Sequence, residues 1–306
     1  MSAEGTPLEG KRDVFGSCHP IVNFLYFGII LGFSMISMHP VCLIISAISA
    51  CAYYITLKGA KASRLLLRAV LPLFLLTVII NPAFSHEGET TLMYLSTGNP
   101  LTLETIIYGV SAGIMMTAIL IWFACFTETV TSDKFVYLFG RIIPALSLIL
   151  SMTLRFVPRF KAQFDTVRDV QKMLGRDTSN GKLTARIRNA VACFSIVITW
   201  SLENAIETSD SMKSRGYGTK KRTAYSIYRW DDRDKTLLTF LIFAGLFLLS
   251  AGLAGKLFWR YFPNIRGVLT GTMTILSELV FLALCFLPVM LNKKEERIWS
   301  SLQSKI

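Results

Sequence analysis

Charged residues are scarce in this chain, and their scarcity argues against an ordinary soluble protein. Only 17% of the 306 residues are charged, whereas soluble domains carry roughly 25%. Hydrophobic residues make up 52%, and the mean hydropathy is +0.49. They gather in runs of about 20 residues, the length that spans a bilayer as a helix. No short cleavable hydrophobic segment precedes the first run, so we expect no signal peptide. The composition predicts an all-α polytopic membrane protein.

The residue patterns of common catalytic and metal sites are also missing. The sequence has no GxxxxGK[ST], HExxH or GxSxG motif, so we do not expect this chain to hydrolyse ATP or to be an enzyme. Its histidines are only three and lie far apart: His19, His39 and His86. None of the six cysteines forms a CxxC pair, and most lie in apolar runs, which predicts reduced, packed side chains. We expect no cofactor, no metal and no catalytic residue.

Six apolar runs are the predicted transmembrane helices. They are Ile21–Ser37, Pro40–Thr56, Ala69–Phe84, Thr105–Thr127, Thr236–Gly255 and Gly267–Leu291. Two more apolar stretches, Phe135–Phe156 and Ala190–Leu202, are different. Charge flanks the first on both sides, and the second is too short to cross alone. We expect both to dip into the inner leaflet or to slope under the other helices.

Three GxxxG pairs occur in the predicted spans, and such pairs permit close helix approach. They are Gly28/Gly32, Gly109/Gly113 and Gly267/Gly271. Each pair could serve packing within the chain or contact with another membrane protein, and the sequence leaves both open.

Basic residues orient the predicted helices. Four Lys or Arg lie between the second and third spans, whereas the loops after the first and third spans have none. Basic loops stay in the cytoplasm. From Arg155 to Lys235 there are 17 Lys or Arg and nine Asp or Glu, which predicts a cytoplasmic segment. Both termini are then cytoplasmic in a multi-pass protein of the cell membrane. The net charge of +12 reflects this topology rather than nucleic-acid binding.

The chain therefore divides into three predicted parts. Residues 1–134 hold the N-terminal transmembrane helices. Residues 135–235 form an inner-leaflet and cytoplasmic module. Residues 236–306 form a C-terminal transmembrane hairpin with a cytoplasmic tail.

Two long amphipathic helices are predicted in the middle part. Apolar residues of the first recur at helical spacing, namely Phe160, Phe164 and Val167. This stripe either packs on a neighbouring helix or meets a partner. The first helix should end near residues 177–181, which are rich in turn formers. The second should run from Leu183 to about Lys213, with Gly216 suited to the C-cap.

Several motifs resemble the transmembrane (T) component of energy-coupling factor transporters, over about Phe24 to Asp234. They are Arg155–Pro158, Val170–Lys172, Asn81–His86, Pro100–Glu104 and, most specific, the Arg-Gly-Tyr-Gly signature within Ser209–Gly218. The resemblance implies a non-catalytic scaffold in an ABC-type importer of vitamins or other micronutrients. Such a scaffold sits among membrane lipid and couples two cytoplasmic ATPases to a small membrane substrate-binding (S) component.

In that family, each of two coupling helices ends in a short motif, typically Ala-Arg-Gly, that enters a groove on one ATPase. The implied docking residues form two groups: Ser214, Arg215 and Gly216, and then Met173, Leu174, Gly175 and Arg176. Leu174 stands where the family usually has arginine. Either Arg176 takes that role or the contact is apolar. Arg215 on its own could also be only a cation that stabilises a helix C-terminus.

Two other classes of function stay open. A channel or secondary transporter would show paired intramembrane charges and inverted repeats, whereas the predicted spans hold one isolated carboxylate, Glu278, and no convincing repeat. An intramembrane enzyme would need polar residues that converge at membrane depth, and none do so in the sequence. We expect Glu278 to face protein or to be protonated, because a bare carboxylate in the bilayer is costly. A structural hydrogen bond and a proton relay are its two possible roles.

Overall fold

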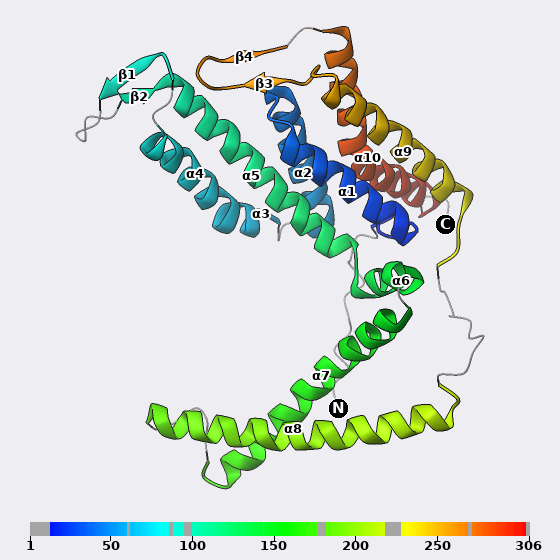
Figure 1. The fold of residues 1–306 in the computed structure, drawn as a ribbon. Coiled ribbons are helices and arrows are strands. Elements are labelled where there is room, and N and C mark those ends of the chain that lie inside the picture. Colours follow the sequence, from blue (N-terminus) through cyan, green and yellow to red (C-terminus); the bar gives the residue numbers. More distant parts are fainter. Residues whose placement is uncertain are drawn as a thin grey trace. The chain divides into compact units, whose positions relative to one another are not determined.

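The computed structural model describes residues 13–59, 62–85, 88–94, 100–142, 144–176, 182–217, 228–268 and 271–303. The chain divides into two compact units (Figure 1). The bundle unit comprises Met1–Thr131 and Tyr228–Ile306, and the arm unit comprises Ser132–Ile227. The arm unit overlaps the predicted middle part of the chain. The described residues are mostly helical, which confirms the all-α membrane fold.

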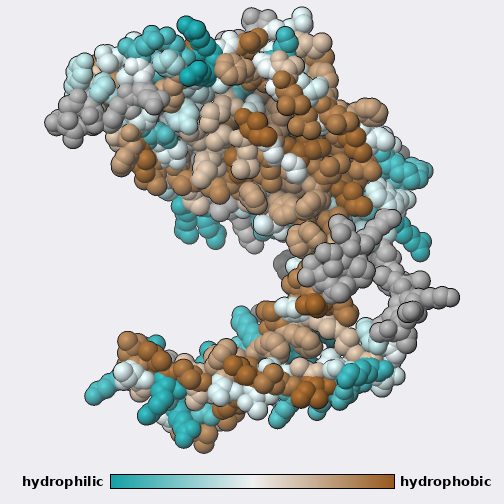
Figure 2. All heavy atoms as spheres, in the orientation of Figure 1, coloured by the Kyte–Doolittle hydropathy of each residue, from teal (hydrophilic) through white to brown (hydrophobic). Residues whose placement is uncertain are grey.

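The bundle unit contains long helices and two short antiparallel hairpins. Its helices are α1 (Pro20–Ile36), α2 (Pro40–Lys58), α3 (Ala62–Leu65), the π-helical turn η2 (Leu66–Val70), α4 (Leu71–Phe84), α5 (Leu103–Thr129), α9 (Asp232–Leu253) and α10 (Thr272–Gln303). The hairpins pair β1 (Thr91–Tyr94) with β2 (Pro100–Thr102), and β3 (Trp259–Arg260) with β4 (Arg266–Gly267). Hydrophobic side chains cover much of the visible face of this unit (Figure 2).

The six predicted spans correspond to α1, α2, α4, α5, α9 and α10. By length and composition, five described helices are able to cross a membrane: α2, α5, α8, α9 and α10. Helices α1 and α4 are apolar but shorter. Helix α8, which lies in the arm unit, joins the set because it extends well beyond the apolar stretch Ala190–Leu202.

An aromatic core joins α1, α2 and α5. Tyr26, Tyr53 and Trp122 are fully buried, together with Phe27. Their rings meet mainly edge to face, and Tyr26 lies 6.2 Å from Trp122 between ring centroids. The Trp122 indole nitrogen donates a hydrogen bond to the Ser46 hydroxyl at 3.1 Å. Large buried rings contribute much of the packing energy of a core, so this cluster fixes the three helices.

The three glycine pairs have different environments. Gly109 and Gly113 let α5 approach α4 closely, because a Cβ at Gly113 would lie 2.9 Å from the Phe74 ring. Around Gly28 and Gly32 there is open space, so these two do not pack closely against another helix that the structure describes.

The prediction for the last span and its glycine pair was wrong at one end. The helix begins at Thr272, not Gly267, because Arg266 and Gly267 form strand β4. Gly267 is needed in this hairpin because a Cβ there would lie 2.0 Å from the Trp259 ring.

Glu278 of α10 faces protein, as expected. Its carboxylate oxygen lies 3.2 Å from Nδ1 of His39, which is fully buried at the start of α2. The other ring nitrogen of His39 lies 3.2 Å from the carbonyl oxygen of Val268. The pair therefore ties α10 and the chain just after β4 to the start of α2.

The arm unit consists of α6 (Ser132–Ile142), α7 (Pro144–Met173) and α8 (Leu183–Ser214). The apolar stretch Phe135–Phe156 is divided between α6 and α7 instead of forming one helix. Helix α7 ends before the predicted stop at residues 177–181, which lie outside the described residues. The predicted bounds of α8 are confirmed to within a residue at each end.

Candidate docking surface on the arm unit

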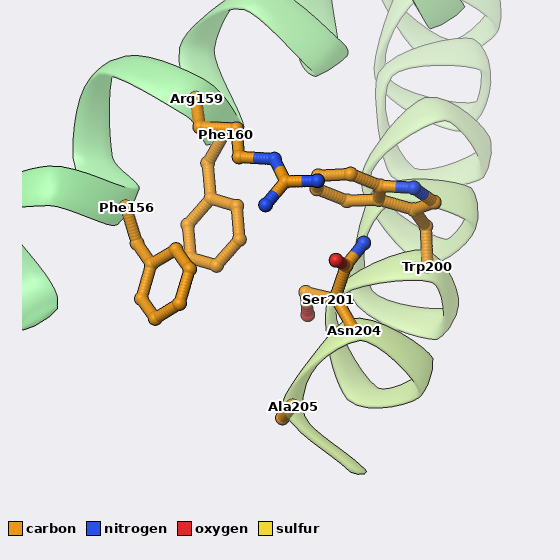
Figure 3. A pocket seen from close by; sticks show the side chains of 7 residues that line it. All are labelled: Phe156, Arg159, Phe160, Trp200, Ser201, Asn204 and Ala205. Carbon is orange, nitrogen blue, oxygen red and sulfur yellow. The ribbon is translucent and has the colours of Figure 1, made fainter. Parts of the chain in front are cut away.

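Helices α7 and α8 cross, and their C-terminal ends lie on opposite sides of the crossing (Figure 1). Aromatic side chains occupy the crossing (Figure 3). The Phe160 ring meets Trp200 edge-on, with 6.0 Å between centroids and 83° between ring planes. Phe156 stacks beside Phe160 at 5.8 Å. The Arg159 guanidinium lies over the Trp200 ring at 5.4 Å. Aromatic and cation–π contacts of this kind hold two helices at one crossing point.

A small pocket lies between these side chains (Figure 3). It is lined by Phe156, Arg159, Phe160, Trp200, Ser201, Asn204 and Ala205. Of the predicted α7 stripe, Phe160 therefore packs against α8. Phe164 and Val167 are half-buried on the same helix. Phe160 therefore contributes to the joint between the two helices.

The C-terminal end of α7 is closed by a glycine in the left-handed region. Gly175 has φ +75°, its amide donates to the Lys172 carbonyl at 3.0 Å, and the Arg176 amide donates to the Gln171 carbonyl at 2.9 Å. These two bonds define a Schellman cap. Leu174 is the residue just before the glycine and is 66% exposed.

The C-terminal end of α8 has the same cap. Gly216 has φ +74°, its amide donates to the Lys213 carbonyl at 2.9 Å, and the Tyr217 amide donates to the Met212 carbonyl at 3.0 Å. Arg215 is the C-cap residue. The two ends therefore match residue by residue, with Leu174 and Arg215 in equivalent positions. Arg176 corresponds to Tyr217, one residue past the glycine.

The two capped ends present different side chains. At the end of α7, Met173 is 85% exposed, and its neighbour Leu174 is exposed as well. At the end of α8, Ser214 and Arg215 are exposed. Among the described residues, the Arg215 guanidinium has no ion-pair partner. One end therefore offers an apolar surface and the other a cation.

An exposed apolar stripe follows α8, and sequence reasoning missed it. Its residues are Leu183, Ile187, Val191, Phe194, Ile198, Leu202 and Ile206, each between 42% and 68% exposed. They recur every three or four positions and so share one face of the helix. A different face, with buried Cys193 and Val197, lies inside the unit. The spacing alone could have revealed the stripe, because a helix with two apolar faces must cover one with something else.

Among the described residues, no group of three or more His, Cys, Asp or Glu side chains could hold a metal ion. All six cysteines are free, and five of them are buried. The described features of the arm unit are the helix crossing, two exposed capped ends and an apolar stripe.

Comparison with known proteins identifies the class. A bundle of apolar helices long enough to cross a membrane is the build of an integral membrane protein. The family model described as cobalt transport protein, CbiQ, matches residues 19–225. The match covers more than half of the chain. The chain therefore belongs to the CbiQ family, and the predicted relationship to T components is confirmed.

Individual relatives carry the name energy-coupling factor transporter transmembrane protein EcfT. The protein from Lactobacillus helveticus is 32% identical over 109 residues, which are 35% of this chain and 39% of the relative. The Staphylococcus aureus protein is 33% identical over 98 residues, 32% of this chain and 37% of the relative. The Listeria innocua protein is 26% identical over 223 residues, 67% and 79% of the two chains. The matched segment thus spans less than half the length of the first two relatives.

Proposed function

We propose that this chain is the T component of an energy-coupling factor importer. In this role it couples ATP hydrolysis by two cytoplasmic ATPases to an S component that takes up a vitamin or another micronutrient. The chain itself is non-catalytic. The observation that carries the proposal is the pair of equivalent glycine-capped ends on α7 and α8.

The spacing of the two ends suits a pair of ATPases. Thirteen residues separate Phe160, at the crossing, from Met173 at the end of α7. Fourteen separate Trp200 from Ser214 at the end of α8. At 1.5 Å per residue, each end lies about 20 Å from the crossing. Two equivalent ends at equal distances fit two related grooves on a pair of subunits.

The apolar stripe of α8 supports a second partner. From Leu183 to Ile206 it extends about 35 Å along the helix axis. An exposed apolar surface of this size marks a protein or membrane contact. We assign it to the S component, whose own membrane helices can cover it, with lipid beside them.

We infer that the arm unit is cytoplasmic, although α8 has the length and composition of a span. Between Arg188 and Glu203 there are 14 uncharged residues, which extend about 21 Å as a helix. The hydrocarbon core is about 30 Å thick. If α8 crossed the bilayer, charged residues at one or both ends of this apolar stretch would be buried in the hydrocarbon core. If α8 lies along the membrane surface, these charges stay in water.

Labelling of introduced cysteines tests this topology. Cysteines at Asn180 and Lys220, in a chain without its native cysteines, should react only with reagent that reaches the cytoplasmic side. Both positions lie outside the described residues but within the basic segment. Labelling of either position from outside would contradict the cytoplasmic arm.

Co-purification tests the function itself. Tagged chain extracted in mild detergent from its own cells should bring down two ABC ATPase subunits and a small membrane protein. Reconstituted vesicles should take up that small protein's ligand only when ATP is supplied. The absence of any ATPase from the purified complex would contradict the proposal.

The alternative is a secondary transporter, and one observation favours it: the pair formed by the buried His39 and the largely buried Glu278, which is 14% exposed. Such a pair can relay protons. If its role is structural, Glu278→Gln should retain assembly and ATP-driven uptake, because the amide can still contact His39. Uptake measured with and without a proton gradient separates the two cases. Normal assembly with uptake abolished by Glu278→Gln would favour the relay.

A further inference from the structure

The segment Asp13–His19, which we call the N-terminal strap, lies beside both connections between the two units. The chain leaves the bundle unit after Thr131 and re-enters it at Tyr228. The strap contacts Trp230 and Arg233 next to the second point, and through Tyr53 it is linked to Thr129 next to the first. All the contacts described below lie within the bundle unit.

At the first connection, the strap contacts Tyr53 of α2, which in turn contacts the last residue of α5. The Tyr53 hydroxyl donates to Oδ2 of Asp13 at 3.3 Å and lies 3.0 Å from the Thr129 hydroxyl. The Asn292 amide nitrogen donates to Oδ1 of Asp13 at 3.0 Å. The Asn292 carbonyl oxygen accepts from the Val14 amide at 3.0 Å. Asp13 thereby contacts α2 and α10 directly, and the Tyr53 hydroxyl extends this network to the end of α5.

At the second connection, the strap meets the residues that lead into α9. The His19 ring stacks on Trp230, with 3.9 Å between centroids and 18° between planes. Nδ1 of His19 accepts a hydrogen bond from the Ile21 amide at 3.3 Å, which fixes the ring at the start of α1. Arg233 approaches the Ser17 hydroxyl at 3.5 Å.

The strap is part of the core and not a loose tail. Phe15 is fully buried and meets Tyr26 edge-on at 4.7 Å. Cys18 and His19 are 1% and 2% exposed. Burial of this extent holds the polar contacts at both connections in place.

We propose that the N-terminal strap is the joint that holds both connections of the arm unit, with Asp13, Asn292, His19 and Trp230 as positioning residues for energy coupling. The inference rests on the proposed function. The chain joins the arm unit to the bundle unit at residues near 131 and 228, so a displacement of the arm is transmitted along the chain at these two points. If the chain bends freely at these two points, the displacement of the arm is absorbed there. If the strap holds the two points rigid, the same displacement moves the helices of the bundle.

The test uses the complex of full chain, ATPases and S component in vesicles. Asp13→Ala and Trp230→Ala should leave ATPase association and ATP hydrolysis unchanged. They should lower uptake per ATP hydrolysed by about 2- to 30-fold, the range for mutations that alter coupling between sites. Trp230→Phe retains a stacking ring and should restore coupling. Hydrogen exchange should rise near Thr129 in Asp13→Ala and near Asp232 in Trp230→Ala.

The matched control is Glu128→Gln. Glu128 neighbours Thr129, but its 2.6 Å ion pair with Lys58 is partly exposed and contributes little, so uptake per ATP should not change. The inference would be overturned if Glu128→Gln lowered uptake per ATP as much as the alanine variants do. It would also be overturned if both alanine variants kept the wild-type uptake per ATP. If Asp13→Ala does not fold, the comparison of Trp230→Ala with Trp230→Phe tests the inference. Trp230 is 37% exposed, so its replacement should not prevent folding. A wild-type chain that binds no ATPase would instead defeat the proposed function.

Discussion

The ends of α7 and α8 share one backbone conformation and differ in their side chains. Each closes with glycine at φ near +75° and the same two capping bonds, yet Leu174 stands at one C-cap and Arg215 at the other. The cap positions the residue before the glycine in the same way whatever its side chain. The comparison shows that the shape of a docking end and its chemistry are specified by different residues.

This difference bears on which residue replaces the family's arginine at the end of α7. Arg176 lies one position past Gly175 and matches Tyr217, so the cap directs it differently from Arg215. Leu174 has the equivalent position and is exposed beside Met173. We therefore propose an apolar contact at this end and a polar one at the end of α8, with two ATPase grooves that differ accordingly.

The largest effect is expected from Arg215→Glu. Removal of one partner of a desolvated interface charge pair typically costs about 2–5 kcal/mol, and reversal adds repulsion. Binding of one ATPase should weaken by at least about 30-fold, and ATP hydrolysis should uncouple from uptake while the chain stays folded. Quantify co-purified ATPase, ATP turnover and uptake.

Lys213→Glu is the matched control for that charge reversal. Lys213 lies on the same helix two residues earlier, and its pair with Asp210 at 3.5 Å is exposed. Its reversal should have little effect. If Arg215→Glu leaves all three quantities at the wild-type level, Arg215 does not dock an ATPase.

The next largest effect is expected from Leu174→Glu. A carboxylate placed in an apolar groove loses hydration without gaining a partner, so one ATPase should be lost about as readily as with Arg215→Glu. Leu174→Met keeps the apolar surface and should bind normally. Equal binding by the glutamate and methionine variants, measured by co-purification, would exclude an apolar contact here.

The smallest effect is expected from Arg176→Glu. On the equivalence of the two caps, Arg176 is beside the contact and not in it, so the change should alter ATPase binding less than Leu174→Glu does. Titration of purified ATPase onto immobilised complexes gives the comparison. A larger loss with Arg176→Glu would show that this arginine replaces the missing one.

The local features of this fold were predictable from sequence because their causes are local. Gly216 predicted the end of α8, since a left-handed C-cap favours glycine. Apolar runs predicted six of the bundle helices for a similar reason, because each run is long enough to be a buried or lipid-facing helix.

The contacts that join distant segments were not predictable. Asp13 and Asn292 are 279 positions apart, and no local sequence pattern around either residue indicates that the two are in contact. The break between α6 and α7 was missed because the apolar stretch is continuous across it. The docking residues came from the family resemblance, whereas the equivalence of Leu174 with Arg215 required the backbone geometry.

The crossing at Phe160 and Trp200 makes α7 and α8 a lever with nearly equal arms. With each arm about 20 Å long, every degree of rotation at the crossing displaces each end by about 0.35 Å. Equal arms give equal strokes, so two ATPases that close together would rotate the helices symmetrically, without favouring either groove. The ring contacts at the crossing then act as the pivot, and their stiffness decides how much of each stroke becomes rotation instead of helix bending.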